Sequence, residues 1–223
     1  SMLINATKTQ SDFTGAFGLG FGKTFALWDN IVTVFTYDDG IFARWLVNTL
    51  IYVVVGAGGA TLLAIMGGYA LTKFRFPGRN AVFVVIIGAI SVPGIALAVP
   101  QFLLFAKLGL TNTPWAMIIP SLISPFGLYL MWIFSDQAVP TELLEAARVD
   151  GCGPIRTFLH IMLPMSQSSL LVCTVLSIVW HWNDYFEPGV YFNSVWLKML
   201  PNSLPNLYAE LNKEQHTMIQ TND

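Results

Sequence analysis

The sequence predicts an all-α protein that crosses a membrane several times, because of its composition and the positions of its charges. Of its 223 residues, 54% are hydrophobic and 11% are charged, against roughly 25% charged in an ordinary soluble domain. No charged residue occurs in residues 45–72, 80–106, 108–135 or 157–183. A helix needs about 20 apolar residues to cross the hydrocarbon core of a bilayer. Each of these four uncharged windows therefore predicts one span of a helical bundle.

Basic residues between the windows predict the orientation of the spans. Lys73, Arg75 and Arg79 separate the first two windows, whereas only Lys107 separates the second from the third. Lys and Arg are enriched in cytoplasmic loops. The segment 73–79 is therefore expected in the cytoplasm, and alternation of the spans places the segment 136–156 there as well.

This topology predicts three regions. They are an extracytoplasmic segment at 1–44, a transmembrane core at 45–187 that contains a cytoplasmic loop at 136–164, and an extracytoplasmic loop at 188–223. Export of the segment 1–44 with no span ahead of it would be unusual. We therefore expect this four-span chain to be a fragment of a longer protein.

Prolines inside the windows predict kinks or close packing of the spans. Pro93, Pro100, Pro120 and Pro125 lie within the second and third windows, and membrane bundles tolerate such residues because neighbouring helices satisfy the freed backbone groups. Gating at Pro93 or Pro100 is the alternative interpretation.

Several function classes are excluded. The net charge of −2 gives no basic surface for nucleic acid, and Cys152 and Cys173 lack a metal-ligand spacing. The segment ending in Lys23-Thr24 fails as a phosphate-binding loop because Phe17 stands where a glycine is needed. No enzyme, metal or cofactor is therefore expected. The middles of the windows also lack ionisable residues for ion coupling, so energy for transport is expected from another subunit.

The loop 136–164 is organised as two helices joined by a turn. Thr141 is the expected N-cap of the first helix; one face carries Leu143, Leu144 and Ala147, and the other carries Glu142, Glu145 and Arg148, of which the last two can pair at i, i+3. Asp150-Gly151-Cys152-Gly153 ends that helix. Pro154 suits the start of a second helix, expected to continue through Pro164 into the fourth span.

Two interpretations of this loop remain open from its physics alone. A short amphipathic helix followed by a glycine turn can dock in the groove of a partner protein and pass motion to the spans. The same helix can instead lie on the lipid surface.

A longer pattern in the loop resembles a known family. Glu145-Ala146-Ala147-x-x-Asp150-Gly151-Cys152-x5-Phe158-x-x-Ile161-x-Leu163-Pro164 closely resembles the EAA signature of importer permeases of the ATP-binding cassette (ABC) class. It departs from the signature at Cys152, where the family usually has alanine. "LINATKTQSDF" at 3–13, "LTKFRFPGR" at 71–79 and "WNDYFEP" at 182–188 resemble the sugar-importer branch, the relatives of the maltose permease.

The resemblance implies a type I ABC importer permease of the cytoplasmic membrane, of whose six spans this chain has four. It implies that a coupling helix in the loop contacts a cytoplasmic dimer of ATP-binding subunits. The residues that would make this coupling are Glu145, Ala146, Ala147, Asp150, Gly151, Phe158 and Pro164. The further partners implied are a second permease subunit, as a heterodimer, and an extracytoplasmic solute-binding protein.

The cargo expected is a carbohydrate, either an oligosaccharide or a polyol. Aromatic faces with amide and carboxylate groups suit sugars, so Tyr129, Asn183, Asp184 and Tyr185 are the candidate contacts. Packing and capping of the helix end is the alternative role for residues 182–184. The alternative functions are an importer of a different solute and a channel or membrane scaffold that is not driven by ATP.

Overall fold

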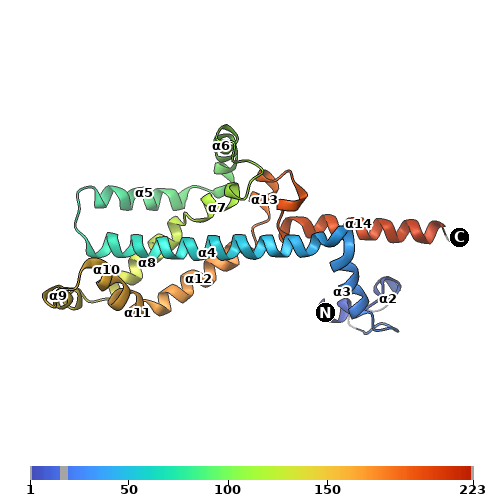
Figure 1. Ribbon diagram of the computed structural model, residues 1–223, viewed down its shortest axis with the longest axis horizontal. Coiled ribbons are helices and arrows are strands. Elements are labelled where there is room, and N and C mark those ends of the chain that lie inside the picture. Colours follow the sequence, from blue (N-terminus) through green and yellow to red (C-terminus); the bar gives the residue numbers. More distant parts are fainter. Residues whose placement is uncertain (1, 16–19, 222–223) are drawn as a thin grey trace. The chain divides into compact units, whose positions relative to one another are not determined.

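The protein is described by a computed structural model over residues 2–15 and 20–221. Every regular element of these residues is helical (Figure 1), which confirms the all-α prediction. The elements are α1 (Met2–Ala6), α2 (Gln10–Gly15), α3 (Leu27–Thr36), the 3-10 turn η1 (Tyr37–Gly40), α4 (Ile41–Lys73), α5 (Arg79–Ser91), α6 (Gly94–Lys107), α7 (Trp115–Ser121), α8 (Pro125–Ala138), α9 (Thr141–Val149), α10 (Pro154–Thr157), the π-helical turn η2 (Phe158–Met162), α11 (Leu163–Met165), α12 (Gln167–Trp182), α13 (Phe186–Tyr191), the 3-10 turn η3 (Val195–Leu197) and α14 (Leu200–Thr221).

The chain forms two compact units, Ser1–Val47 and Asn48–Asp223. In the first unit, the amide side chain of Asn30 in α3 donates hydrogen bonds to the carbonyl oxygens of Ala6 and Lys8, both at 2.9 Å. The opposite side of α3 exposes large apolar side chains, among them Trp28 and Phe35. The polar face of this amphipathic helix is therefore fixed to the segment that precedes it.

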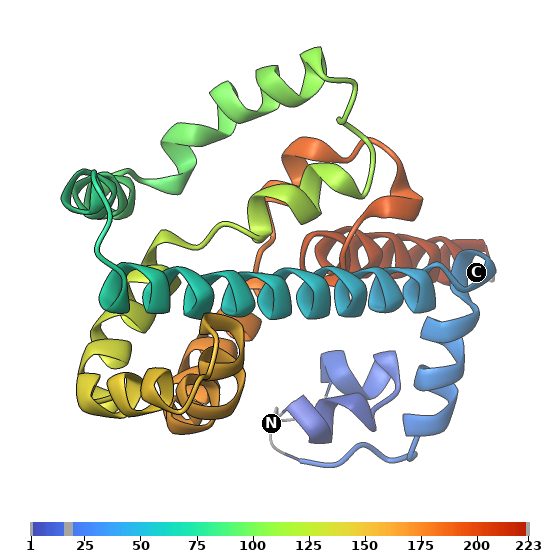
Figure 2. The same ribbon diagram turned by 60° about the vertical axis from the view of Figure 1, so that its left-hand side comes forward.

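In the second unit, glycines bring α4 against the helices that follow it. A Cβ on Gly68 would lie 2.8 Å from the carbonyl carbon of Met131 in α8, and one on Gly67 would lie 2.7 Å from a methyl of Leu128. The buried residues Ile65, Met131 and Cys173 form one cluster that joins α4, α8 and α12, which lie side by side in both views (Figures 1 and 2). Small residues thus allow close helix packing, as expected in a membrane bundle.

Among the described residues, two stretches are long and apolar enough to cross a membrane by themselves, Leu27–Lys73 and Trp115–Gln137. The second and fourth windows instead form bent helix pairs. Arg79–Ser91 and Gly94–Lys107 meet at 103°, and Pro154–Met165 and Gln167–Trp182 meet at 79°. The prediction of four spans therefore corresponds to the structure only if each bent pair crosses as one unit.

The bend in the second window is caused by Pro93. A proline disfavours helical geometry in the residue before it, and Val92 is extended, with φ −85° and ψ 122°. Pro93 is also extended, with ψ 129°, and α6 begins directly after it. The kink predicted from this proline is confirmed, whereas Pro100 and Pro120 lie inside helices.

The prediction that the second loop helix continues directly into the fourth span is wrong, because the fourth window is bent. Pro164 has no N–H, so the carbonyl of His160 loses its normal helical donor. The turn before it, Phe158–Met162, is π-helical, and Ser166 leaves helical geometry with φ −93° and ψ 11°. The chain therefore changes direction at Ser166.

Candidate functional site

The helix α9 begins one residue earlier than predicted. Pro140, with φ −57° and ψ 141°, is its N-cap, and no side chain caps the helix. Thr141 is already the first helical residue, so the expectation that its hydroxyl caps the helix is wrong. The extended ψ of Pro140 sets the start of α9.

One face of α9 is buried against the ends of other helices. Leu144 is 3% exposed and belongs to a cluster with Tyr69 of α4, Val139 and Met162. Ala147 is buried as well, but Leu143 is 43% exposed. Leu143, predicted on one apolar face with Leu144 and Ala147, is not buried with them, because consecutive helical residues are separated by about 100° around the axis.

The opposite face of α9 carries exposed residues. Glu142, Glu145, Ala146 and Arg148 are all exposed. Within the part of the chain that the structure describes, no ion pair joins Glu145 to Arg148, although both residues lie in α9. The predicted i, i+3 pair is therefore absent, and the Glu145 carboxylate faces outward.

The turn after α9 has the geometry predicted for its glycine. Gly151 has φ +78°, its N–H donates to the carbonyl of Arg148, and the N–H of Cys152 donates to that of Ala147 at 2.8 Å. These two bonds form a Schellman motif, which satisfies the last carbonyls of the helix. Asp150 is the C-cap. A Cβ on Gly151 would meet no atom within 4 Å, so only its backbone conformation requires glycine.

Aromatic contacts and a lysine connect this segment to α4. The ring of Phe158 lies 5.5 Å from that of Tyr69 between centroids, and the ring of Phe74 lies 5.3 Å from it on another side. The ammonium of Lys73 donates a 2.7 Å hydrogen bond to the carbonyl of Val139, just before α9. The segment 73–79 and the start of the loop therefore lie at the same end of the unit, as alternation of the spans predicts.

The four candidate sugar contacts lie on α8 and on the segment that follows α12. Tyr129 lies in an aromatic group between α5 and α8, with its ring 6.3 Å from that of Phe83 and 6.1 Å from that of Trp132. Among the contacts of the described residues, none joins it to Asn183, Asp184 or Tyr185. That the four residues bind a sugar together stays a prediction.

Asn183 and Asp184 bind neighbouring backbone. The Asn183 amide donates to the carbonyl of Val179 at 2.7 Å. One carboxylate oxygen of Asp184 accepts from the N–H groups of Phe186 and Glu187, both at 3.1 Å. This geometry agrees with the capping alternative. Tyr185, by contrast, is 64% exposed.

Sequence reasoning missed Glu187 in α13, beyond the end of the fourth window. Burial, together with the nearby charge of Asp184, raises the pKa of Glu187 to about 7. Burial also raises the pKa of Asp184, against the lowering effect of its two N–H donors. The Asp-x-x-Glu spacing in "WNDYFEP" was the available signal. No group of three or more His, Cys, Asp and Glu side chains in the described residues could hold a metal ion.

A family model described as "Binding-protein-dependent transport system inner membrane component" matches residues 60–204. The chain belongs to this family. The match includes the C-terminal part of α4, residues 60–73, together with the whole loop 136–164 and residues 183–187. The chain is therefore a membrane component of a transport system.

Curated relatives of this inner membrane component carry the names of sugar and polyol phosphate transporters. The lactose transport system permease protein LacG of Rhizobium radiobacter is 31% identical over 98% of this chain and 78% of its own length. The arabinooligosaccharides transport system permease protein AraQ of Halalkalibacterium halodurans is 33% identical over 80% of this chain. The sn-glycerol-3-phosphate permease protein UgpE of Pectobacterium atrosepticum is 29% identical over 73%. The chain spans only 63% of the length of AraQ and 59% of that of UgpE.

A solved structure shares the fold. It is described as a bacterial ABC transporter involved in the import of the acidic polysaccharide alginate, and it superposes with a TM-score of 0.77 at 22% identity. The superposition covers 90% of this chain and 69% of the other. The predicted helical fold of an ABC importer permease is confirmed.

Proposed function

We propose that this chain is the permease part of an ATP-driven importer that carries a carbohydrate, an oligosaccharide or a polyol, across the cytoplasmic membrane. The names of the lactose and arabinooligosaccharide relatives support the cargo class. The name of the glycerol phosphate relative extends it to a phosphorylated polyol. The partners proposed are a dimer of ATP-binding subunits, a second permease subunit and an extracytoplasmic solute-binding protein.

The two faces of α9 support its proposed role in coupling the ATP-binding subunits to the spans. Glu145 and Ala146 face outward, where a partner can contact them, while Leu144 and Ala147 are buried. The buried face touches the cluster around Tyr69, at the end of α4. A partner that displaces α9 therefore pushes directly on a spanning helix, which is how closure of the ATP-binding subunits would reach the transport path.

The Gly151 turn fixes the direction in which the chain leaves α9. Its two hydrogen bonds and its positive φ hold α10 and Phe158 in place relative to α9. Phe158 in turn contacts Tyr69. We therefore assign Asp150 and Gly151 to the turn, Phe158 and Pro164 to transmission, and Glu145, Ala146 and Ala147 to the contact and its support.

The test uses the full-length protein with its neighbouring subunits and replaces Gly151 by valine or by asparagine. Valine does not tolerate a positive φ, whereas asparagine does, and neither variant meets a neighbouring atom at Cβ. We expect Gly151→Val to reduce both co-purification of the ATP-binding subunit and solute uptake at least about tenfold, which corresponds to about 1.4 kcal/mol of coupling. Gly151→Asn should retain both.

The outcomes separate the alternatives. Equal attachment and equal uptake in the two variants would contradict coupling through α9. Recovery of the chain with no ATP-binding subunit in any variant would favour a channel or scaffold with α9 on the lipid surface. Competition of uptake by a disaccharide but not by sn-glycerol 3-phosphate would place the cargo among sugars, and the reverse result would place it among polyol phosphates.

A further inference from the structure

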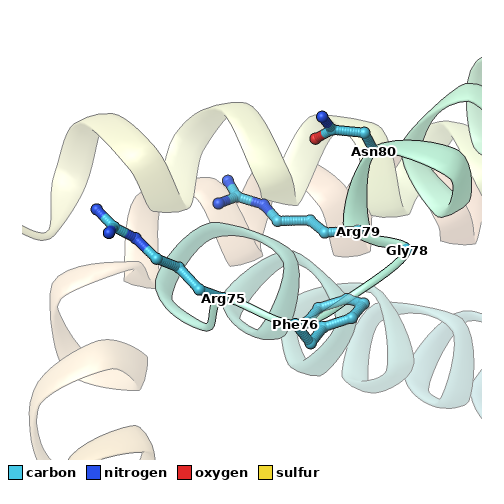
Figure 3. Close-up of a pocket in the computed structure, with 5 residues that line it drawn as sticks. All are labelled: Arg75, Phe76, Gly78, Arg79 and Asn80. Atoms are coloured by element: carbon cyan, nitrogen blue, oxygen red, sulfur yellow. The ribbon is translucent and has the colours of Figure 1, made fainter.

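The turn between α4 and α5 carries two arginines whose side chains extend in the same direction. Arg75 follows the end of α4, Arg79 is the first residue of α5, and Gly78 between them has φ +87°. Figure 3 shows both arginine side chains extending to the left of Phe76 and Asn80, with the guanidinium group of Arg75 farther out than that of Arg79. Together these five residues line an open cavity of about 240 Å3. Two like charges therefore face one small space.

Nothing in the described structure neutralises these two charges. Neither guanidinium forms an ion pair or a hydrogen bond with a described residue, and the sequence has no Asp or Glu between Asp39 and Asp136. The nearest basic neighbour, Lys73, already binds the carbonyl of Val139. Two unpaired guanidinium groups that line one cavity favour an anion with several oxygen acceptors, because the planar fork of each binds phosphate in a bidentate manner.

The backbone at the start of α5 adds positive character to the same cavity. The N-cap, Gly78, has no side chain to accept a hydrogen bond. The N–H groups of Asn80 and Ala81 have no backbone acceptor in the turn, whereas that of Val82 donates to Gly78. First-turn N–H groups attract negative charge. They reinforce the site that the two arginines form.

The surface next to the cavity favours a lipid over a free ion. The helix α5 has no buried residue, and Val82, Val84 and Val85 in its first two turns are 43%, 67% and 69% exposed. The other side of α5 packs on α8, with the Phe83 and Trp132 rings 4.4 Å apart. An apolar strip thus runs from the cavity along a membrane helix, where acyl chains lie.

We propose that Arg75 and Arg79 bind the phosphate of an anionic phospholipid whose acyl chains lie along the valines of α5. The arginines hold the headgroup at the membrane surface, and the ligand also screens the repulsion between them. The proposal rests on this chain being a membrane protein and is independent of its cargo.

The test is the retention of phosphatidylglycerol by the full-length protein in detergent, counted by native mass spectrometry against phosphatidylcholine. The variant is Arg75→Gln with Arg79→Gln, and the matched control is Lys107→Gln with Arg156→Gln, which removes two other exposed basic residues. A juxtamembrane basic residue contributes roughly a fivefold preference for anionic lipid, so the arginine variant should retain about 25-fold less phosphatidylglycerol. The control should retain it like the unmodified protein.

Competition distinguishes the lipid from a free anion. Inorganic phosphate should displace little phosphatidylglycerol beyond the effect of chloride at equal ionic strength. Displacement by inorganic phosphate at concentrations that match the lipid would overturn the lipid assignment. Retention unchanged in the arginine variant would overturn the site. Because neither guanidinium has a partner in the described structure, the melting temperature of the delipidated protein should not fall in the variant, and this readout excludes misfolding as the cause.

Discussion

The two ends of the second unit use polar residues in opposite ways. At the end that holds α9, apolar contacts bury Leu144 against Tyr69, and the polar side chains of the same helix stay outside. At the other end, the side chains of Asn183 and Asp184 form hydrogen bonds with backbone groups of their own chain. The difference indicates that the α9 end is available to a partner, whereas the residues after α12 first shape their own chain.

The largest effect is expected from truncating the buried side of α9. Leu144→Ala should lower the free energy of unfolding by about 2–4 kcal/mol, because it leaves a cavity in the Tyr69 cluster. Leu143→Ala, at an exposed position of the same helix, should cost under about 1 kcal/mol. Thermal unfolding of the full-length protein in detergent measures both. Equal costs would show that α9 is not anchored through Leu144.

The next effect comes from the cap at the other end. Asp184→Ala removes the acceptor of two N–H groups and should destabilise the protein by about 1–2 kcal/mol. Asp184→Asn keeps an oxygen acceptor and should cost less. If Asp184 binds cargo and does not cap, both variants would weaken uptake while leaving the melting temperature unchanged.

Burial of Glu187 predicts that the stability of the protein depends on pH. Its folded-state pKa, about 7, is above its ordinary value of 4.5, so between these values the folded state binds more protons than the unfolded state. Its contribution to stability is full below pH 4.5, falls as the pH rises and is lost above about 7. The melting temperature should therefore fall across this window. Glu187→Gln should reduce that slope, and an identical slope in the variant would contradict the assignment.

The smallest effect on stability should come from the exposed face of α9. Glu145→Gln removes no ion pair in the described structure, so the free energy of unfolding should change by less than about 0.5 kcal/mol. Co-purification of the ATP-binding subunit should nevertheless fall. If Glu145→Gln lowered the free energy of unfolding but left co-purification unchanged, Glu145 would stabilise its own chain and would not contact the ATP-binding subunit.

The predictable parts of this protein are those fixed locally by the chain. The positive φ of Gly151, the start of α10 at Pro154 and the break at Pro93 follow from the conformational limits of glycine and proline, and all three are found. The uncharged windows likewise locate the apolar helices.

The parts that could not be predicted depend on residues far apart in the sequence. Leu143 and Leu144 are equally apolar, and only the position of Tyr69 and Met162 decides which is buried. The sequence does not indicate which residues Tyr129 contacts, because its neighbour Phe83 comes from a different helix, α5. The π-helical turn before Ser166 has no local signature apart from Pro164.

The bend at Pro93 also bears on how the chain enters the membrane during synthesis. The helices α5 and α6 have 13 and 14 residues, so each extends about 20 Å, short of the roughly 30 Å hydrocarbon core. Neither half can be released into lipid alone, and the backbone groups freed at the bend need a polar or protein neighbour. The pair therefore needs neighbouring helices, such as α4 and α8, in order to insert. Its insertion then depends on assembly with those helices and not on its own hydrophobicity alone.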